Sequence, residues 1–349
     1  MAQKNWNAGI IRPVPVAPAG PYQDGAATGV WTLDQVAYWQ KQGLWPVAGN
    51  INTANVGLFG GGSPDNNISN TNVIDRITIL TTGNAVDYGD LTVARHYLAS
   101  CASTTRAVWG GGNTSQNVID YVTISTSGNA ADFGDLLSGS SASLAMAGCN
   151  SSTRGIFGGG ITTNVIQYIT IASVGNATDF GDLTLGRYGL ASCSSSTRGV
   201  FAAGSDGSVT NVIDYITIAS TGNATDFGDV TTTNKNYYTA GCSNSTRGLF
   251  GGGTPDPGNG NSNAICYITI ASAGNATDFG DLAAPDNQWR GGLAACSSST
   301  RGIFAGGEAP TNTINYVTIA NTGNATDFGD LSVARQALAG CSGGNGGAQ

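Results

Sequence analysis

The stretch Gly175-Asn176-Ala177-Thr178-Asp179-Phe180-Gly181-Asp182 recurs six times, with small changes, along this chain of 349 residues. The first glycines of the copies are 45, 47, 47, 52 and 49 residues apart, at Gly83, Gly128, Gly175, Gly222, Gly274 and Gly323. This period matches the blades of a β-propeller and is longer than that of leucine-rich or helical solenoids. The spacing therefore predicts an all-β fold, a six-bladed β-propeller.

The residues around the third copy divide into the four strands of one blade. Residues 154–160 are apolar and run into glycines, which permit a sharp turn. Residues 164–171 are β-branched and aromatic, as in a strand. Gly175 and Asn176 form the next turn, residues 180–183 begin a short outer strand, and residues 189–193 form an inner strand that ends in cysteine.

The two ends of the repeat region complement each other. The first repeat begins at residues 55–62 without an inner strand, whereas residues 337–341 are an inner strand with nothing after it. We predict that the two fragments complete one blade and so close the ring, which removes the exposed edges of an open sheet. The predicted domains are an N-terminal arm at residues 1–50 and the propeller at residues 51–349.

Charge and hydropathy exclude two classes of partner. The chain has 14 Lys and Arg against 22 Asp and Glu, a net charge of −8. Such a chain lacks the basic surface that nucleic acid requires, so no nucleic-acid partner is expected. No apolar run approaches the roughly 20 residues of a membrane helix, and no secretory signal is visible, so we expect no membrane insertion.

Six of the seven cysteines occupy the same place in every repeat: Cys101, Cys149, Cys193, Cys242, Cys296 and Cys341. Equivalent residues of neighbouring blades do not generally meet disulfide geometry, so we expect free thiols that act as small buried hydrophobes. The seventh, Cys266, replaces an Asp or Asn of the repeat. We predict no metal site and no cofactor.

Motifs that suggest catalysis are better explained by the repeat. Asp-Phe-Gly resembles a kinase magnesium motif, but it recurs around the ring and the other kinase motifs are missing. We expect the repeated aspartates to accept hydrogen bonds from backbone amides or from the repeat arginines, which are Arg106, Arg154, Arg198, Arg247 and Arg301. The single histidine, His96, has no partners for metal binding or catalysis. No catalytic residue is predicted.

The repeat resembles the kelch repeat. Paired glycines follow a hydrophobic strand, as at Gly158-Gly159, and a tyrosine stands where kelch repeats have one, as at Tyr168. The arginine of the family is present as Arg95, Arg187 and Arg335, whereas its tryptophan is replaced by Phe or Tyr. The resemblance implies kelch-like blades of a divergent type and carries no information about a ligand.

Sequence variation among the repeats falls on one face of the ring. In an up-and-down blade, loops one and three lie on one face and loops two and four on the other; here only loops two and four vary. Function is usually carried by such loops. Their aromatic and charged residues, the predicted ligand-binding set, are Tyr97, Tyr188, Lys235, Tyr237, Tyr238, Trp289 and Arg290. Aromatic rings flanked by amides and carboxylates suit a sugar, although a docked protein is an open alternative.

The first 50 residues differ in composition from the repeats. Prolines punctuate an extended stretch, after which Thr32 is a suitable N-cap for a short helix, with Gln35 as its capping-box partner. Four of the six tryptophans lie here, at Trp6, Trp31, Trp39 and Trp45. An arm this short cannot bury its own apolar surface, so we expect these tryptophans to anchor it on another surface.

Residues 29–35 and 44–46 resemble segments of bacteriophage virion structural proteins, including tail-fibre-like proteins. The resemblance implies a non-enzymatic virion protein, present in many copies, that binds other virion proteins through residues 1–50. The propeller would bind a host-surface glycan or protein, or decorate the shell. Two alternatives are a non-viral kelch-like interaction scaffold and a glycan-processing enzyme. The enzyme would use carboxylates that break the repeat pattern, namely Asp256, Asp286 and Glu308.

Overall fold

The structure is a computed structural model that divides into two compact units, residues 1–52 and 53–349. It describes residues 18, 31–42, 44–45, 52–66, 69–113, 117–137, 144–161, 163–231, 236–255, 262–283 and 290–344. Within these residues, no helix is long and apolar enough to cross a membrane.

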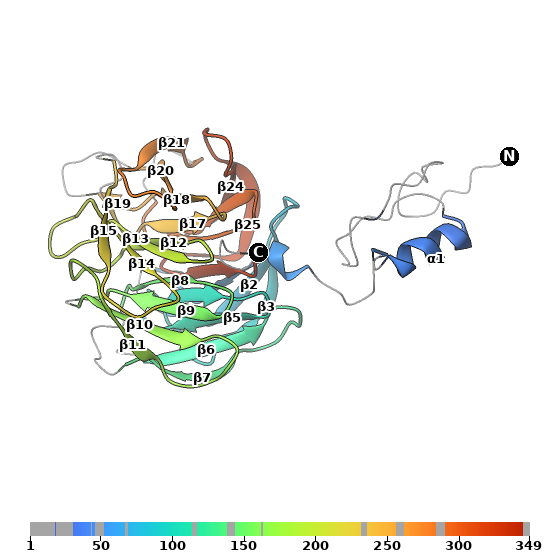
Figure 1. The fold of residues 1–349 in the computed structure, drawn as a ribbon, viewed down its shortest axis with the longest axis horizontal. Helices are drawn as coiled ribbons and strands as arrows, with labels where there is room; N and C mark the ends of the chain where they lie inside the picture. Colours follow the sequence, from blue (N-terminus) through green and yellow to red (C-terminus); the bar gives the residue numbers. More distant parts are fainter. Residues whose placement is uncertain are drawn as a thin grey trace. The chain divides into compact units, whose positions relative to one another are not determined.

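Six four-stranded antiparallel sheets, which we number as blades I to VI, and one two-stranded sheet make up the described part of the second unit (Figure 1). Blade I contains β26 (Ala339–Ser342), β1 (Val56–Gly60), β2 (Val73–Thr78) and β3 (Val86–Asp90). Blade II contains β4 (Ala99–Ala102), β5 (Arg106–Gly110), β6 (Val118–Thr123) and β7 (Ala131–Asp135). Blade III contains β8 (Ala147–Asn150), β9 (Arg154–Gly158), β10 (Val165–Thr170) and β11 (Thr178–Asp182).

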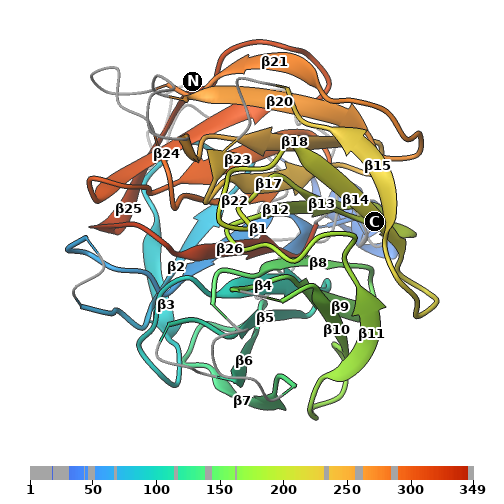
Figure 2. The ribbon, with the colours of Figure 1, turned by 90° about the vertical axis from the view of Figure 1, so that its left-hand side faces the viewer.

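Blade IV contains β12 (Ala191–Ser194), β13 (Arg198–Ala202), β14 (Val212–Thr217) and β15 (Thr225–Asp229). Blade V contains β17 (Ala240–Ser243), β18 (Arg247–Gly251), β20 (Ala264–Thr269) and β21 (Thr277–Asp281). Blade VI contains β22 (Ala294–Ser297), β23 (Arg301–Ala305), β24 (Thr311–Thr318) and β25 (Thr326–Arg335). In each blade the first strand named lies at the centre of the ring and the last at its rim (Figure 2). The predicted six-bladed, all-β propeller is confirmed.

The ring closes between the two ends of the repeat region. The C-terminal strand β26 pairs antiparallel with β1, with Leu58 opposite Cys341 and Gly60 opposite Ala339. Blade I is therefore assembled from both ends of the unit, as the sequence predicts. Because β26 covers β1, the inner edge of β1 is paired and the ring is closed.

The repeated glycine-asparagine motif joins each blade to the one before it. The backbone N–H of Gly175 donates to the carbonyl of Phe133 at 2.7 Å, and the Asn176 side chain accepts from the N–H of Asp135 at 3.0 Å. Ala177 N–H then donates to the Asp135 carbonyl at 2.8 Å. The asparagines that make this contact are Asn84, Asn129, Asn176, Asn223, Asn275 and Asn324. The motif is thus a latch that covers the outer strand of the preceding blade.

The cysteines fill the junctions between blades. The Sγ atom of Cys149 in β8 would lie 2.7 Å from a β-carbon at Gly199, in the second strand of the next blade. All seven cysteines are buried and free, as predicted. A small residue is needed on both sides of each junction, which explains why cysteine and glycine recur together.

These thiols should be unreactive in the folded protein. Burial raises the pKa of Cys149, Cys242, Cys266 and Cys341 to about 12, and that of the other three well above the usual value. Because only the thiolate attacks disulfide reagents, we expect no native reaction with Ellman's reagent at pH 8 and reaction of all seven thiols in guanidinium. Rapid reaction of any thiol before unfolding would contradict this packing.

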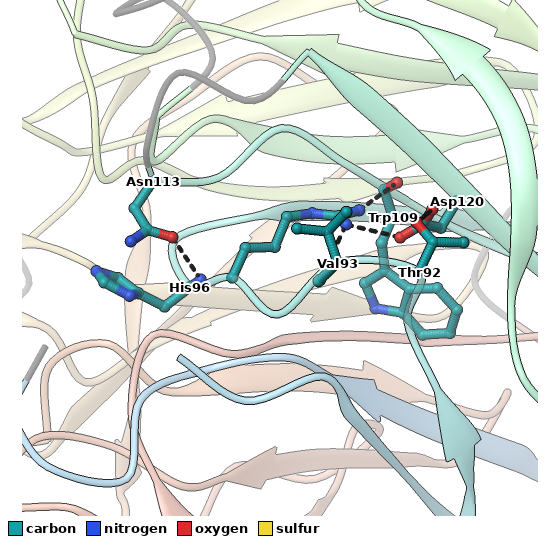
Figure 3. Close-up of polar contacts among 7 residues, drawn as sticks. Thr92, Val93, His96, Trp109, Asn113 and Asp120 are labelled. Carbon is teal, nitrogen blue, oxygen red and sulfur yellow. Dashed lines mark hydrogen bonds and ion pairs between the residues drawn. The ribbon is translucent and has the colours of Figure 1, made fainter. Parts of the chain in front are cut away.

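A buried arginine stabilises the inner half of several blades. Arg95 forms an ion pair with Asp120 at 2.6 Å, and both side chains are fully buried. Its guanidinium also donates to the carbonyls of Val93 and Trp109, and Thr92 donates to Asp120 (Figure 3). The equivalent pairs are Arg187 with Asp214 and Arg335 with Asp75. The arginines that match the kelch pattern are therefore buried structural residues.

The buried Arg–Asp pair also explains the unusual Cys266, which stands at the position of the aspartate in blade V. In blade V the arginine is replaced by Asn236, which donates to the Gly252 carbonyl at 3.0 Å, and the partner aspartate is replaced by buried Cys266. Because neither member of the pair is charged, no unpaired charge is left in the core. The two positions therefore change together within one chain.

The second set of arginines does not form the ion pairs that the sequence suggested. Arg154 donates to the carbonyl of Ile218 in the next blade at 2.7 Å, and its guanidinium lies 4.3 Å from the ring centre of Tyr168. The same cation–π contact is made by Arg106, Arg198, Arg247 and Arg301. Within the described residues the predicted ion pairs between these arginines and the motif aspartates are therefore wrong, because each guanidinium instead contacts a backbone carbonyl of the next blade and a tyrosine ring of its own blade.

The N-terminal unit contains helix α1 (Leu33–Lys41). The predicted capping box is present: Gln35 N–H donates to Thr32 Oγ1 at 3.3 Å, and Thr32 N–H donates to Gln35 Oε1 at 2.9 Å. Trp31 packs edge-on against Trp45 at 5.2 Å, and Trp39 against Tyr38 at 5.1 Å. No residue of α1 is buried. Trp6 lies outside the described residues.

Candidate functional site at the channel mouth

Six equivalent residues, one just before each inner strand, form a closed ring of backbone hydrogen bonds around the propeller axis. They are Tyr97, Ala145, Gly189, Tyr238, Gly292 and Ala337. Each donates its N–H to the carbonyl of the equivalent residue in the preceding blade, at 2.6–2.9 Å. All six have left-handed φ angles between 55° and 63°, and four of them are not glycine. The ring requires this conformation, because it turns each N–H toward the neighbouring blade.

The ring narrows the central channel. Beneath it lies a collar of Leu98, Met146, Leu190, Thr239, Leu293 and Leu338. The cavity between ring and collar has a volume of about 60 Å³, and a second cavity of about 80 Å³ is lined by the collar and by the inner strands. On this face of the propeller, a ligand larger than the first cavity would have to bind above the ring.

Four of the tyrosines predicted for ligand binding meet at this mouth. Tyr97 in blade II and Tyr238 in blade V come from opposite sides of the ring and stack across the axis, with 4.6 Å between ring centres. Tyr237 lies 4.7 Å from Tyr238, and Tyr188 lies 6.2 Å from Tyr237. All four are half-buried, and burial raises the pKa of Tyr238 well above its ordinary value. We call Tyr97, Tyr188, Tyr237 and Tyr238 the tyrosine cluster.

His96 fixes the polar border of the cluster. Its ring lies 4.8 Å from that of Tyr97, and its Nδ1 is 2.6 Å from Asn70 Oδ1. Because Asn113 Nδ2 also donates to that oxygen, Nδ1 carries the proton in the neutral ring and Nε2 is left as the acceptor. Asn113 Oδ1 accepts from the backbone N–H of His96 at 3.0 Å (Figure 3). Burial lowers the pKa of His96, which favours this neutral form.

Arg290 differs from its predicted role as a ligand-binding residue. It is the blade VI equivalent of Arg187, only 3% exposed, and its guanidinium donates to Asn315 and to the carbonyls of Gly306 and Thr313. Its hydrogen-bonding groups are used inside the blade, so we leave it out of the site. Burial also lowers its pKa to about 10.

Other predicted residues lie outside the described part of the chain, namely Lys235, Trp289, Asp256 and Asp286. Across the residues that the structure does describe, no group of three or more His, Cys, Asp or Glu side chains could hold a metal ion.

Comparison with known proteins establishes the fold alone. No family model and no curated protein matches the sequence. The solved structure of YjhT is similar, with a TM-score of 0.58 and 10% sequence identity over 72% of this chain and 88% of that one. Since 491 chains of solved structures match, the fold does not select a function, and only the site can indicate one.

Proposed function

We propose that this protein is a non-catalytic binding propeller that takes up carbohydrate at the tyrosine cluster. The observation that carries the proposal is the convergence of Tyr97, Tyr188, Tyr237 and Tyr238 at the channel mouth, on the face where the repeats vary. Half-buried tyrosines offer apolar ring faces to the C–H face of a sugar and hydroxyl groups to its polar edges.

The surroundings of the cluster support a polar ligand. Asn70, His96 and Asn113 form a fixed hydrogen-bonded network at one border, and buried Ser205 pairs through its backbone with Tyr188 at another. These groups already bond one another, and they give the border of the site a polar surface that a purely hydrophobic ligand or an apolar peptide would not match. A sugar, whose surface combines C–H groups with hydroxyls, fits both halves of the site.

The binding test begins with a glycan array probed with the whole chain, followed by calorimetric titration of the best sugar. Replacing Tyr237 with Ala should weaken binding at least tenfold, because one stacking ring is lost while its backbone pairing in β16 (Asn236–Tyr237) with β19 (Thr254–Pro255) remains. Tyr38→Ala, in the exposed helix α1, is the matched control and should bind like the parent chain. Equal affinity of Y237A and the parent would contradict the proposal.

The setting that we propose is the virion of a bacteriophage, with residues 1–50 as the attachment to other virion proteins. Two observations support it: the resemblance of residues 29–35 and 44–46 to virion proteins, and the exposure of Leu33 and Tyr38 on α1. Mass spectrometry of purified particles distinguishes this setting from a non-viral kelch-like scaffold. The protein must co-purify with the particles through residues 1–50.

A further inference from the structure

The face that carries loops two and four has accessible charges of one sign in the part of the chain that the structure describes. Three carboxylates in these loops reach solvent wholly or in part, those of Asp65, Asp206 and Glu308. Glu308 counts for less, because burial raises the pKa of its carboxyl. The arginines of the same loops are at most 3% exposed and hydrogen-bonded within the propeller; they are Arg95, Arg187, Arg290 and Arg335. The sequence of the remaining loop residues adds Asp256, Asp286 and Lys235, so carboxylates still predominate.

The accessible arginines lie at the opposite ends of the strands. In blades II to VI the second strand begins at a half-buried arginine just after loop one, as β9 does at Arg154; the others are Arg106, Arg198, Arg247 and Arg301. Loops one and two lie on opposite faces of an up-and-down propeller, so the two faces differ in charge. The negative charge of the loop-two face is therefore a local property, in addition to the net charge of −8 on the whole chain.

Asp206 borders the tyrosine cluster in blade IV. It follows Ser205, whose backbone pairs with that of Tyr188 through hydrogen bonds of 2.9 and 3.0 Å. The Asp206 carboxylate is exposed and accepts from the Ser208 N–H at 3.1 Å, which fixes it in a tight turn. Its charge is therefore held beside one of the four tyrosines.

Asp65 borders the cluster on another side, in loop two of blade I. Its carboxylate accepts from the N–H of Ser69 at 2.7 Å and from the hydroxyl of Ser69 at 2.5 Å. Burial lowers the pKa of His96, and the Asp65 carboxylate partly opposes that shift. Because the His96 ring lies 4.8 Å from that of Tyr97, the negative charge of Asp65 also reaches the cluster.

Tyrosine rings attract cations as well as C–H groups, because the face of the ring is negative. An ammonium group above such a face is stabilised further when carboxylates lie nearby. We propose that the ligand of the tyrosine cluster is a sugar with a protonated amino group, attracted by the ring faces and by Asp65 and Asp206. This inference rests on the proposed function and narrows its substrate class: amino sugars are favoured over their N-acetylated forms, and acidic sugars are disfavoured.

The test compares a glucosamine trimer with the N-acetylglucosamine trimer, which has the same skeleton without the charges, and with a galacturonic acid trimer. Each is titrated calorimetrically into the whole chain at mildly acidic pH, where a sugar amine is protonated. We expect the glucosamine trimer to bind at least about tenfold more tightly than either of the others at low salt. This preference should shrink at about 0.5 M salt, which screens the charges.

Charge-neutralising variants locate the source of the preference. D65N and D206N should each weaken binding of the glucosamine trimer about threefold and leave binding of the N-acetylated trimer unchanged. Asp179→Asn is the matched control, because it removes the same charge from an exposed carboxylate of the outer strand β11, and it should bind like the parent chain. Asp206 and Asp179 are both exposed, so D206N and D179N should unfold at the parent's temperature without sugar.

The outcomes separate this inference from the proposed function. If the parent chain binds sugar and Y237A does not, but the glucosamine trimer shows no advantage, the inference fails and the proposed function stands. If D65N and D206N bind the glucosamine trimer like the parent, or D179N weakens binding as much as they do, the two carboxylates are not the cause and the inference is again overturned. If the parent binds no sugar on the array, the proposed function fails and the inference with it.

Discussion

A chain that ends at Leu338 is expected to lose cooperative folding. It lacks β26, which pairs with β1 and supplies Cys341 to the core of blade I. It also loses two junctions between blades, because Trp109 Nε1 donates to the Ala339 carbonyl and Ser342 Oγ donates to the Ser297 carbonyl. The loss should exceed the roughly 5–15 kcal/mol by which a typical domain is stable.

Thermal unfolding followed by near-ultraviolet circular dichroism measures this effect. The control is a chain that ends at Gly344, which keeps every described residue and should unfold like the full chain. If the chain that ends at Leu338 showed a cooperative transition within a few degrees of the control, closure by β26 could not be what holds the ring together.

Replacing Asp214 with Ala should destabilise the propeller by about 3–5 kcal/mol, the cost of removing one partner from a buried ion pair. The change leaves Arg187 fully buried without its counter-charge, although its guanidinium keeps the carbonyls of Phe201 and Ala203. Thr184, which donates to Asp214, also loses its acceptor. The measurement is the free energy of unfolding in urea.

Two further variants show whether the unpaired charge or the lost packing causes the loss of stability in D214A. Asp206→Ala, at an exposed carboxylate of the same blade, should change stability by no more than about 0.5 kcal/mol. The double variant R187M/D214L should recover most of the loss, since blade V already carries the uncharged combination Asn236 and Cys266. A D214A protein as stable as D206A would contradict this account of the buried pairs.

The fold could be predicted because the sequence repeats at a regular spacing. Six copies at a blade-like spacing give the blade number, and the unmatched strands at residues 55–62 and 337–341 give the closure. The latch could not be predicted from the sequence, because each copy of the motif contacts the copy in the preceding blade. Asn176 and Asp135 belong to different copies, and six near-identical copies do not indicate which one each contacts.

The Arg290 error had a signal in the sequence. It stands six residues before Cys296, as Arg95 and Arg187 stand before Cys101 and Cys193, and that alignment would have placed it in the core. Grouping it with the variable loop hid this equivalence. The contact between Tyr97 and Tyr238 was harder to predict, because it depends on the width of the ring at its mouth.

The sequence shows Glu308 only as a break in the repeat pattern. It is one of three carboxylates that stand outside the repeat pattern, and the sequence does not indicate which residue it contacts. Its place beside Gly291 depends on how loop two of blade VI folds against the start of the inner strand. The unsatisfied oxygens of Glu308 and Gln336 are properties of packing, and composition and spacing do not report them.

A crystal structure of the chain with its best array sugar would show where the ligand binds. We expect a sugar ring at the channel mouth, stacked on Tyr237 or Tyr238. A sugar bound on the opposite face of the propeller, or on its outer strands, would contradict it.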